Sequence, residues 1–110
     1  MISPAVETLY NDVDPDTAND LAASLLPHAT LAFESPAPPP AWAEPAFEGK
    51  IAFLRCTQDQ ALPTFLQDLF VQRSGVKWIV KDIEAGHSPW ASKPKETSAM
   101  VIDFAKEFGE

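Results

Sequence analysis

The chain has 110 residues, of which 45% are apolar, and this suits one small folded domain rather than a disordered segment. Sixteen acidic against eight basic residues give a net charge of −8, which argues against nucleic acid and anionic membrane surfaces as partners. The single cysteine excludes an intrachain disulfide and a cysteine-rich metal site, and we expect no metal or cofactor. Without a secretory signal at its start or an apolar run long enough to span a bilayer, the chain is expected to be cytoplasmic.

The first part, residues 1–48, is predicted to be helical and then proline-rich. Residues 4–10 predict a short helix. Asp14 followed by Pro15 is typical of a helix start, and apolar residues then recur at helical spacing as far as Pro27. Five of the eleven prolines lie between residues 34 and 49, which predicts an extended connector without helix.

The second part, residues 49–110, alternates strand and helix signals. Residues 50–56 and 76–82 are short apolar runs that predict strands, Pro63 opens a helix between them, and Pro94 opens a final helix. The β-α-β-α order predicts parallel strands joined by a right-handed crossover. Two amphipathic helical faces are expected: Leu62, Phe65, Leu66, Leu69 and Phe70 on the first helix, and Thr97, Met100, Val101, Phe104 and Phe108 on the last.

Two side chains able to do acid–base chemistry follow the two predicted strands. Asp59 follows the first strand and His87 follows the second. Because the carboxyl ends of parallel strands lie at one edge of a sheet, we expect these side chains to form a hydrogen bond. An aspartate bonded to one imidazole nitrogen fixes the tautomer and leaves the other nitrogen as a general acid or base. The plainer alternatives are a turn residue for Asp59 and a surface histidine for His87.

The two loops resemble those of α/β-hydrolases. Residues 55–63 are similar to the acid loop of that family, in which an aspartate follows the penultimate strand and a proline opens the next helix. Residues 86–90 are similar to the histidine loop, and residues 10–42 resemble the helical cap of esterase-like members. The resemblance implies a partial α/β-hydrolase fold: two parallel strands with flanking helices in residues 49–110, behind an N-terminal helical cap segment and connector in residues 1–48.

The nucleophile of that family is not found in this sequence. It sits in a Gly-x-Ser-x-Gly elbow, and none of the four glycines here flanks a serine in that pattern. Cys56 lies in an apolar run and is expected to be a buried small side chain. Ser88 directly follows His87, which is poor geometry for a serine nucleophile that uses this histidine as its base. We expect Trp90, Ser88 and Gln60 to contact substrate, with Trp90 walling a pocket beside His87.

Three functions remain open. The first is proton transfer by Asp59 and His87 on a small hydrophobic molecule, of the cyclase, lyase or isomerase type, in a homo-oligomer. The second is half of an ester or acyl hydrolase, completed by a partner chain that bears the nucleophile. The third is a non-catalytic remnant. Association is expected because two parallel strands cannot cover both sheet faces and leave no open edge.

Overall fold

The structure, a computed structural model, describes residues 4–109, and a two-stranded parallel sheet lies at its centre. Strand β1 (Ala52–Cys56) pairs in parallel with β2 (Ile79–Ile83). The predicted parallel pairing is confirmed, although both strands begin later than the sequence indicates. The second begins later because Val76 N and Trp78 Nε1 both donate to Ser74 Oγ, which ties this segment into the preceding turn.

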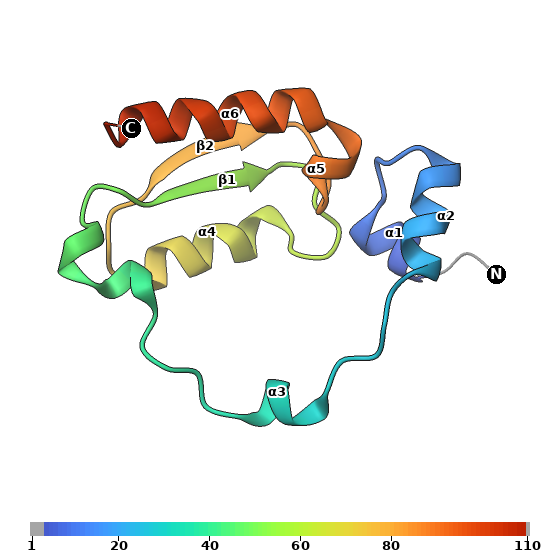
Figure 1. Cartoon of the computed structure of the whole chain (residues 1–110), viewed down its shortest axis with the longest axis horizontal. Coiled ribbons are helices and arrows are strands. Elements are labelled where there is room, and N and C mark those ends of the chain that lie inside the picture. Colours follow the sequence, from blue (N-terminus) through green and yellow to red (C-terminus); the bar gives the residue numbers. More distant parts are fainter. Residues whose placement is uncertain (1–3, 110) are drawn as a thin grey trace.

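Two helices flank the sheet. Helix α4 (Thr64–Arg73) connects the strands and α6 (Pro94–Glu107) ends the fold, and the sheet lies between them (Figure 1). Both helices agree with the predicted positions. The short helix α5 (Pro89–Ser92), which precedes α6, was not predicted, because four residues are too few to show a helical period.

Ion pairs join each helix to the strand beside it. The Arg55 guanidinium on β1 donates to both carboxylate oxygens of Asp68 on α4, at 2.7 and 3.1 Å, and also reaches Asp82 on β2 at 3.2 Å. This bidentate contact holds the pKa of the Asp68 carboxyl below its ordinary value. On the other side, Lys81 on β2 forms an ion pair with Glu107 on α6. Both helices therefore contact the sheet through ion pairs as well as through packing.

The N-terminal helices form a small unit of their own. Helices α1 (Pro4–Leu9) and α2 (Pro15–Ala23) pack together beside the carboxyl ends of the strands (Figure 1). The Asp14 cap is confirmed, since its carboxylate accepts a bond from Thr17 N at 3.1 Å. The prediction that α2 continues to Pro27 is wrong, because the helix ends at Ser24, whose hydroxyl donates a hydrogen bond to Leu21 O. The residue that precedes a proline, here Leu26, also disfavours the helical conformation.

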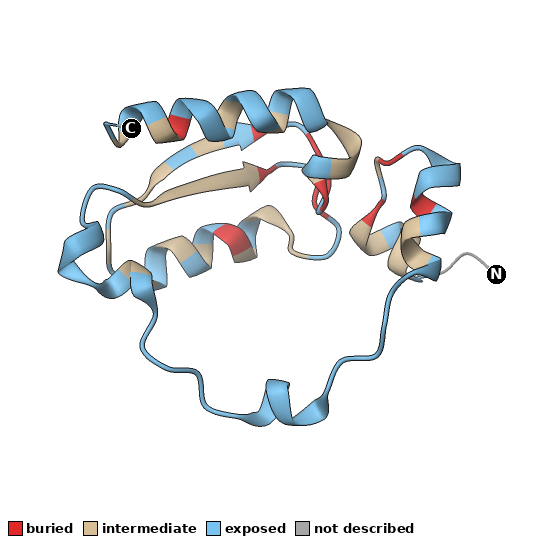
Figure 2. Cartoon of the chain, viewed as in Figure 1, coloured by how far each residue is buried: buried red, intermediate tan, exposed pale blue. Residues whose placement is uncertain are grey.

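The segment that follows contains a short helix, α3 (Thr30–Glu34), which precedes the predicted connector. The connector itself, predicted to be free of helix over residues 34–49, contains two 3-10 turns, η1 (Ala41–Ala43) and η2 (Pro45–Phe47). That expectation is wrong because a single 3-10 turn needs few hydrogen bonds, and Pro45 in the first position of η2 gives up no donor that the turn uses. Residues 23–41 are all exposed and arch away from the core (Figure 2).

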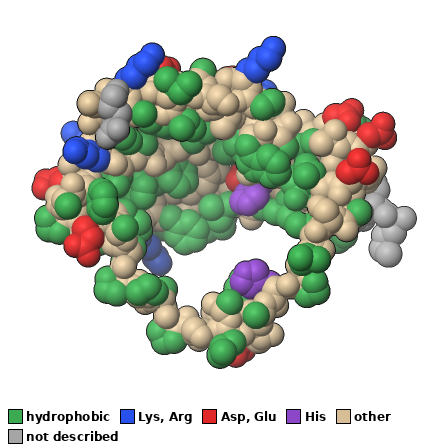
Figure 3. All heavy atoms as spheres, viewed as in Figure 1, with side chains coloured by type: hydrophobic (Ala, Val, Ile, Leu, Met, Phe, Trp, Pro, Cys, Tyr) green, Lys and Arg blue, Asp and Glu red, His purple; other side chains and the backbone are tan. Residues whose placement is uncertain are grey.

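The buried core is small and divided. One cluster contains Tyr10, Val13 and Ala18 in the N-terminal unit, and the other contains Cys56, Ile83 and Ala85 at the ends of the strands. Many large apolar side chains are instead exposed, namely Leu25, Leu26, Leu31, Phe33, Phe47, Phe65, Phe70, Val80, Trp90, Val101 and Ile102. Figure 3 shows apolar side chains over much of the viewed face of the core and along the connector.

The predicted apolar face of α4 is only partly the face that the helix buries. Leu66 and Leu69 are half-buried, but Phe65 is 67% exposed, and the fully buried residue of this helix is Gln67. The Gln67 amide accepts a bond from Cys56 N at 3.0 Å and donates to Cys56 O and Leu62 O at 2.9 and 2.8 Å. Thr57 N bonds to β2, so Cys56 presents its backbone to the outer side of β1. Gln67 therefore occupies the outer edge of β1 at its carboxyl end.

Within residues 4–109, no helix combines the length and the apolar character that crossing a membrane requires.

Candidate active site

The Asp59 carboxylate is held by the turn that follows β1. Its Oδ1 accepts bonds from Ala61 N at 2.9 Å and Leu62 N at 2.8 Å. Aspartate side chains in turns commonly accept hydrogen bonds from backbone N–H groups that follow them by two or three residues. These two bonds fix the position and the rotation of the carboxylate, and its side chain is only 5% exposed.

The His87 loop lies next to the Asp59 loop because pairing continues beyond the strands. Thr57 N donates to Ile83 O and Gln58 N donates to Ala85 O, both at 3.0 Å. The His87 Nδ1 atom then lies 2.9 Å from Asp59 Oδ2 and 3.1 Å from Oδ1. The predicted hydrogen bond between the two side chains is confirmed.

This bond determines what the imidazole can do. An ionised carboxylate only accepts hydrogen bonds, so the Nδ1 atom of His87 carries the proton that lies between the two side chains. In the neutral ring the lone pair is then on Nε2, which has no hydrogen-bond partner among residues 4–109. The His87 side chain is 40% exposed. A nitrogen of this kind is accessible and able to accept a proton from a bound molecule.

The three expected substrate contacts occupy different environments. Ser88 is buried and starts α5, where its carbonyl accepts a bond from Ala91 N at 3.0 Å, and Gln60 is exposed in the Asp59 turn. Trp90 is 57% exposed, so its ring faces solvent rather than enclosing a pocket beside His87. The exposed residues 23–41 arch away from this part of the core (Figure 1).

A turn that sequence patterns did not indicate contacts both the Asp59 loop and the His87 loop. Between α1 and α2, Asn11 Nδ2 donates to Gln58 O in the Asp59 loop at 2.9 Å. The neighbouring Asp12 Oδ2 accepts a bond from Gly86 N in the His87 loop at 2.8 Å. Its partners are far away in the sequence, so no local pattern could have revealed this turn.

Cys56 lies close to the site without being able to act as a nucleophile. Burial, followed by the negative charges of Asp59 and Asp12, raises the pKa of its thiol to about 11. The thiol is therefore protonated at neutral pH, and only the thiolate is nucleophilic. This supports the expectation that Cys56 is a buried small side chain.

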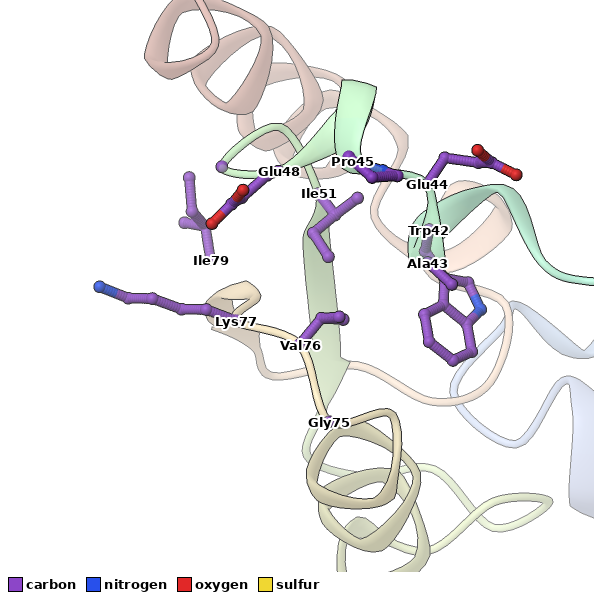
Figure 4. Close-up of a pocket in the computed structure, with 11 residues that line it drawn as sticks. Trp42, Ala43, Glu44, Pro45, Glu48, Ile51, Gly75, Val76, Lys77 and Ile79 are labelled. Atoms are coloured by element: carbon purple, nitrogen blue, oxygen red, sulfur yellow. The ribbon is translucent and has the colours of Figure 1, made fainter.

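The hollowed part of the surface lies at the other end of the sheet. A cavity of about 650 Å³ is lined by Trp42, Ile51, Val76 and Ile79 among others, with Glu44, Glu48 and Lys77 around it (Figure 4). It is formed by the end of the connector and the amino ends of the strands, whereas Asp59 and His87 follow the carboxyl ends. The two features are therefore separate.

Across residues 4–109 no group of three or more histidine, cysteine or acidic side chains is arranged to hold a metal ion. Comparison with protein-family models and with curated proteins gives no match to this chain. The functional assignment that follows therefore depends on the residues and their geometry.

Proposed function

We propose that Asp59 and His87 form an acid–base dyad that moves protons on a small hydrophobic molecule, in a partial α/β-hydrolase fold without a serine nucleophile. The observation that carries this proposal is the hydrogen bond from His87 Nδ1 to a buried, backbone-held carboxylate. The same bond leaves Nε2 accessible to a substrate. The resemblance of both loops to the acid and histidine loops of α/β-hydrolases supports the assignment.

The reaction class follows from what the site contains. His87 Nε2 removes a proton from an activated C–H or O–H bond, and the electron pair left behind expels a leaving group, shifts a double bond or closes a ring. The imidazolium then returns its proton to the leaving group or to the product. These steps correspond to a lyase, isomerase or cyclase and need no covalent intermediate. General acid–base help of this kind contributes roughly 10²–10⁴ in rate.

A homo-oligomer fits the surface of the chain. A two-stranded sheet leaves one edge of each strand unpaired, and apolar side chains of α4 and α6 such as Phe65, Val101 and Ile102 are exposed. A second copy that covers these faces would bury upward of about 1,000 Å² in a specific contact. The substrate is then enclosed by both copies, since Trp90 of one chain faces solvent.

A second candidate is half of an ester or acyl hydrolase, completed by a chain that bears the nucleophile. The open outer edge of β1 favours it, because a strand of another chain can pair there. Gln67 restricts this pairing to the part of β1 that precedes Cys56. In such a complex His87 Nε2 would accept the proton of a partner serine.

One experiment on the purified chain separates these functions. It combines a fluorophosphonate, which labels activated serines, with nitrobenzisoxazole, whose ring opens when a base removes its C–H proton. We expect no labelling, and ring opening at a rate well above that of free imidazole at the same concentration. Labelling of the chain itself would contradict the proposal, and labelling of a co-purified partner would favour the second candidate. If there is no labelling and ring opening is no faster than with free imidazole, the result would favour the third function, a non-catalytic remnant.

A further inference from the structure

We infer that the Asn11–Asp12 turn positions the dyad by holding the Asp59 loop and the His87 loop together. This inference rests on the proposed function of Asp59 and His87. Each residue of the turn binds one loop: Asn11 binds the backbone next to Asp59, and Asp12 binds the backbone next to His87. Asn11 and Asp12 are therefore positioning residues, which act on a substrate only through His87.

The bonds of this turn reach the residues adjacent to the dyad. Gln58 precedes Asp59, and Gly86 precedes His87. A rotation of either peptide unit moves the neighbouring side chain directly. Ala91 in α5, which follows the His87 loop, also packs against the cluster of Tyr10, Val13 and Ala18. The N-terminal unit thus contacts the chain both before and after His87 in the sequence.

Gly86 shows how closely the turn approaches the loop. A Cβ atom at this position would lie 2.0 Å from Asn11 Oδ1 and 2.7 Å from Asp12 Oδ1, closer than nonbonded atoms can approach. The backbone of Gly86 is not in the left-handed region, unlike that of the other three glycines. Glycine is therefore required at this position by space and not by backbone conformation.

The Asp12 carboxylate is kept in an unfavourable setting. Its Oδ1 is buried and has no hydrogen-bond partner within the described part of the chain, although its Oδ2 binds Gly86. A buried acceptor without a partner is destabilising. The negative charge of Asp12 also disfavours the thiolate of Cys56. Among residues 4–109, the hydrogen bond of this carboxylate is the one from Gly86 N, which points to a role in holding the His87 loop.

The effect on the dyad is measurable by replacing Asp12. Because small displacements of a catalytic group lower rates by up to about 10²-fold, we expect Asp12→Ala to lower the rate of nitrobenzisoxazole opening at least tenfold. Asp12→Asn keeps an oxygen that accepts the bond from Gly86 N and is expected to retain most of the rate. Asp20→Ala, which removes an exposed acid of α2, is the matched control and leaves the rate unchanged.

A spectroscopic readout distinguishes positioning from general stability. We expect the proton between His87 Nδ1 and Asp59 to give a downfield proton NMR signal. We expect Asp12→Ala to broaden or remove this signal at temperatures where the protein is still folded, while Asp12→Asn and Asp20→Ala keep it. A persistent signal and an unchanged rate in folded Asp12→Ala would overturn the inference.

A steric variant tests the same contact without altering Asp12. Gly86→Ala would place a Cβ atom 2.0 Å from Asn11 Oδ1, so it is expected to displace the turn and to remove the downfield signal. A Gly86→Ala variant that stays folded and keeps the signal would count against the inference. If these variants change the signal as expected but His87→Ala retains full activity, the positioning role stands and the proposed function fails.

Discussion

His87→Ala will lower the rate of nitrobenzisoxazole opening by roughly 10²–10⁴-fold, the contribution expected of a positioned general base. The rate is measured on purified protein by absorbance of the phenolate product. His28→Ala is the matched control, because His28 is the other histidine of the chain and lies exposed in the connector. If the His87→Ala and His28→Ala variants have the same rate, His87 does not act as the base.

Asp59→Asn extends this prediction to the carboxylate. Two backbone N–H groups bind Oδ1, so the asparagine oxygen must take that place and its NH₂ group must face His87 Nδ1. The imidazole then accepts a bond at Nδ1 and carries its proton on Nε2, where the lone pair is needed. We expect a loss of activity close to that of His87→Ala, with a circular dichroism spectrum unchanged from the original protein.

Gln67→Leu is expected to give the largest loss of stability among single changes in the sheet region. The side chain has a similar volume, but Cys56 N, Cys56 O and Leu62 O lose their bonds. Each buried polar group without a partner costs about 1–3 kcal/mol. Because the two Cys56 groups are fully buried, we expect the free energy of unfolding, measured by urea denaturation, to fall by about 2–6 kcal/mol, a large part of the stability of a small domain.

A matched variant on the same helix controls for the change of residue type. Gln72 is an exposed glutamine of α4, and Gln72→Leu is expected to change the free energy of unfolding by about 0.5 kcal/mol or less. Equal losses in the two variants would show that Gln67 does not protect the edge of β1. The difference between them measures the contribution of its three bonds.

Local signals in the sequence predicted the parallel strands and the dyad. The apolar runs and the helix between them define a β-α-β unit, and the handedness and direction of such a unit are almost fixed. Asp59 and His87 then follow the carboxyl ends of adjacent strands, so topology alone brings them together. Their hydrogen bond is a consequence of the element order.

Other features depend on contacts between distant segments, and the sequence did not reveal them. Gln67 lies on a helix with an amphipathic pattern, yet it is the residue that the helix buries, because the backbone of Cys56 needs hydrogen-bond partners. Phe65 fits the predicted apolar face but is exposed, since no part of the described chain covers it. The contact of Asp12 with Gly86 joins two segments that no local rule relates.

The measurement that tests the central claim most directly is the tautomer of His87 in the folded protein. Nitrogen-15 NMR of the neutral imidazole distinguishes a protonated nitrogen from one with a free lone pair. We expect the proton on Nδ1, facing Asp59, and a free lone pair on Nε2. A proton on Nε2 in the neutral ring would contradict the account, because His87 would then lack the base that proton transfer requires.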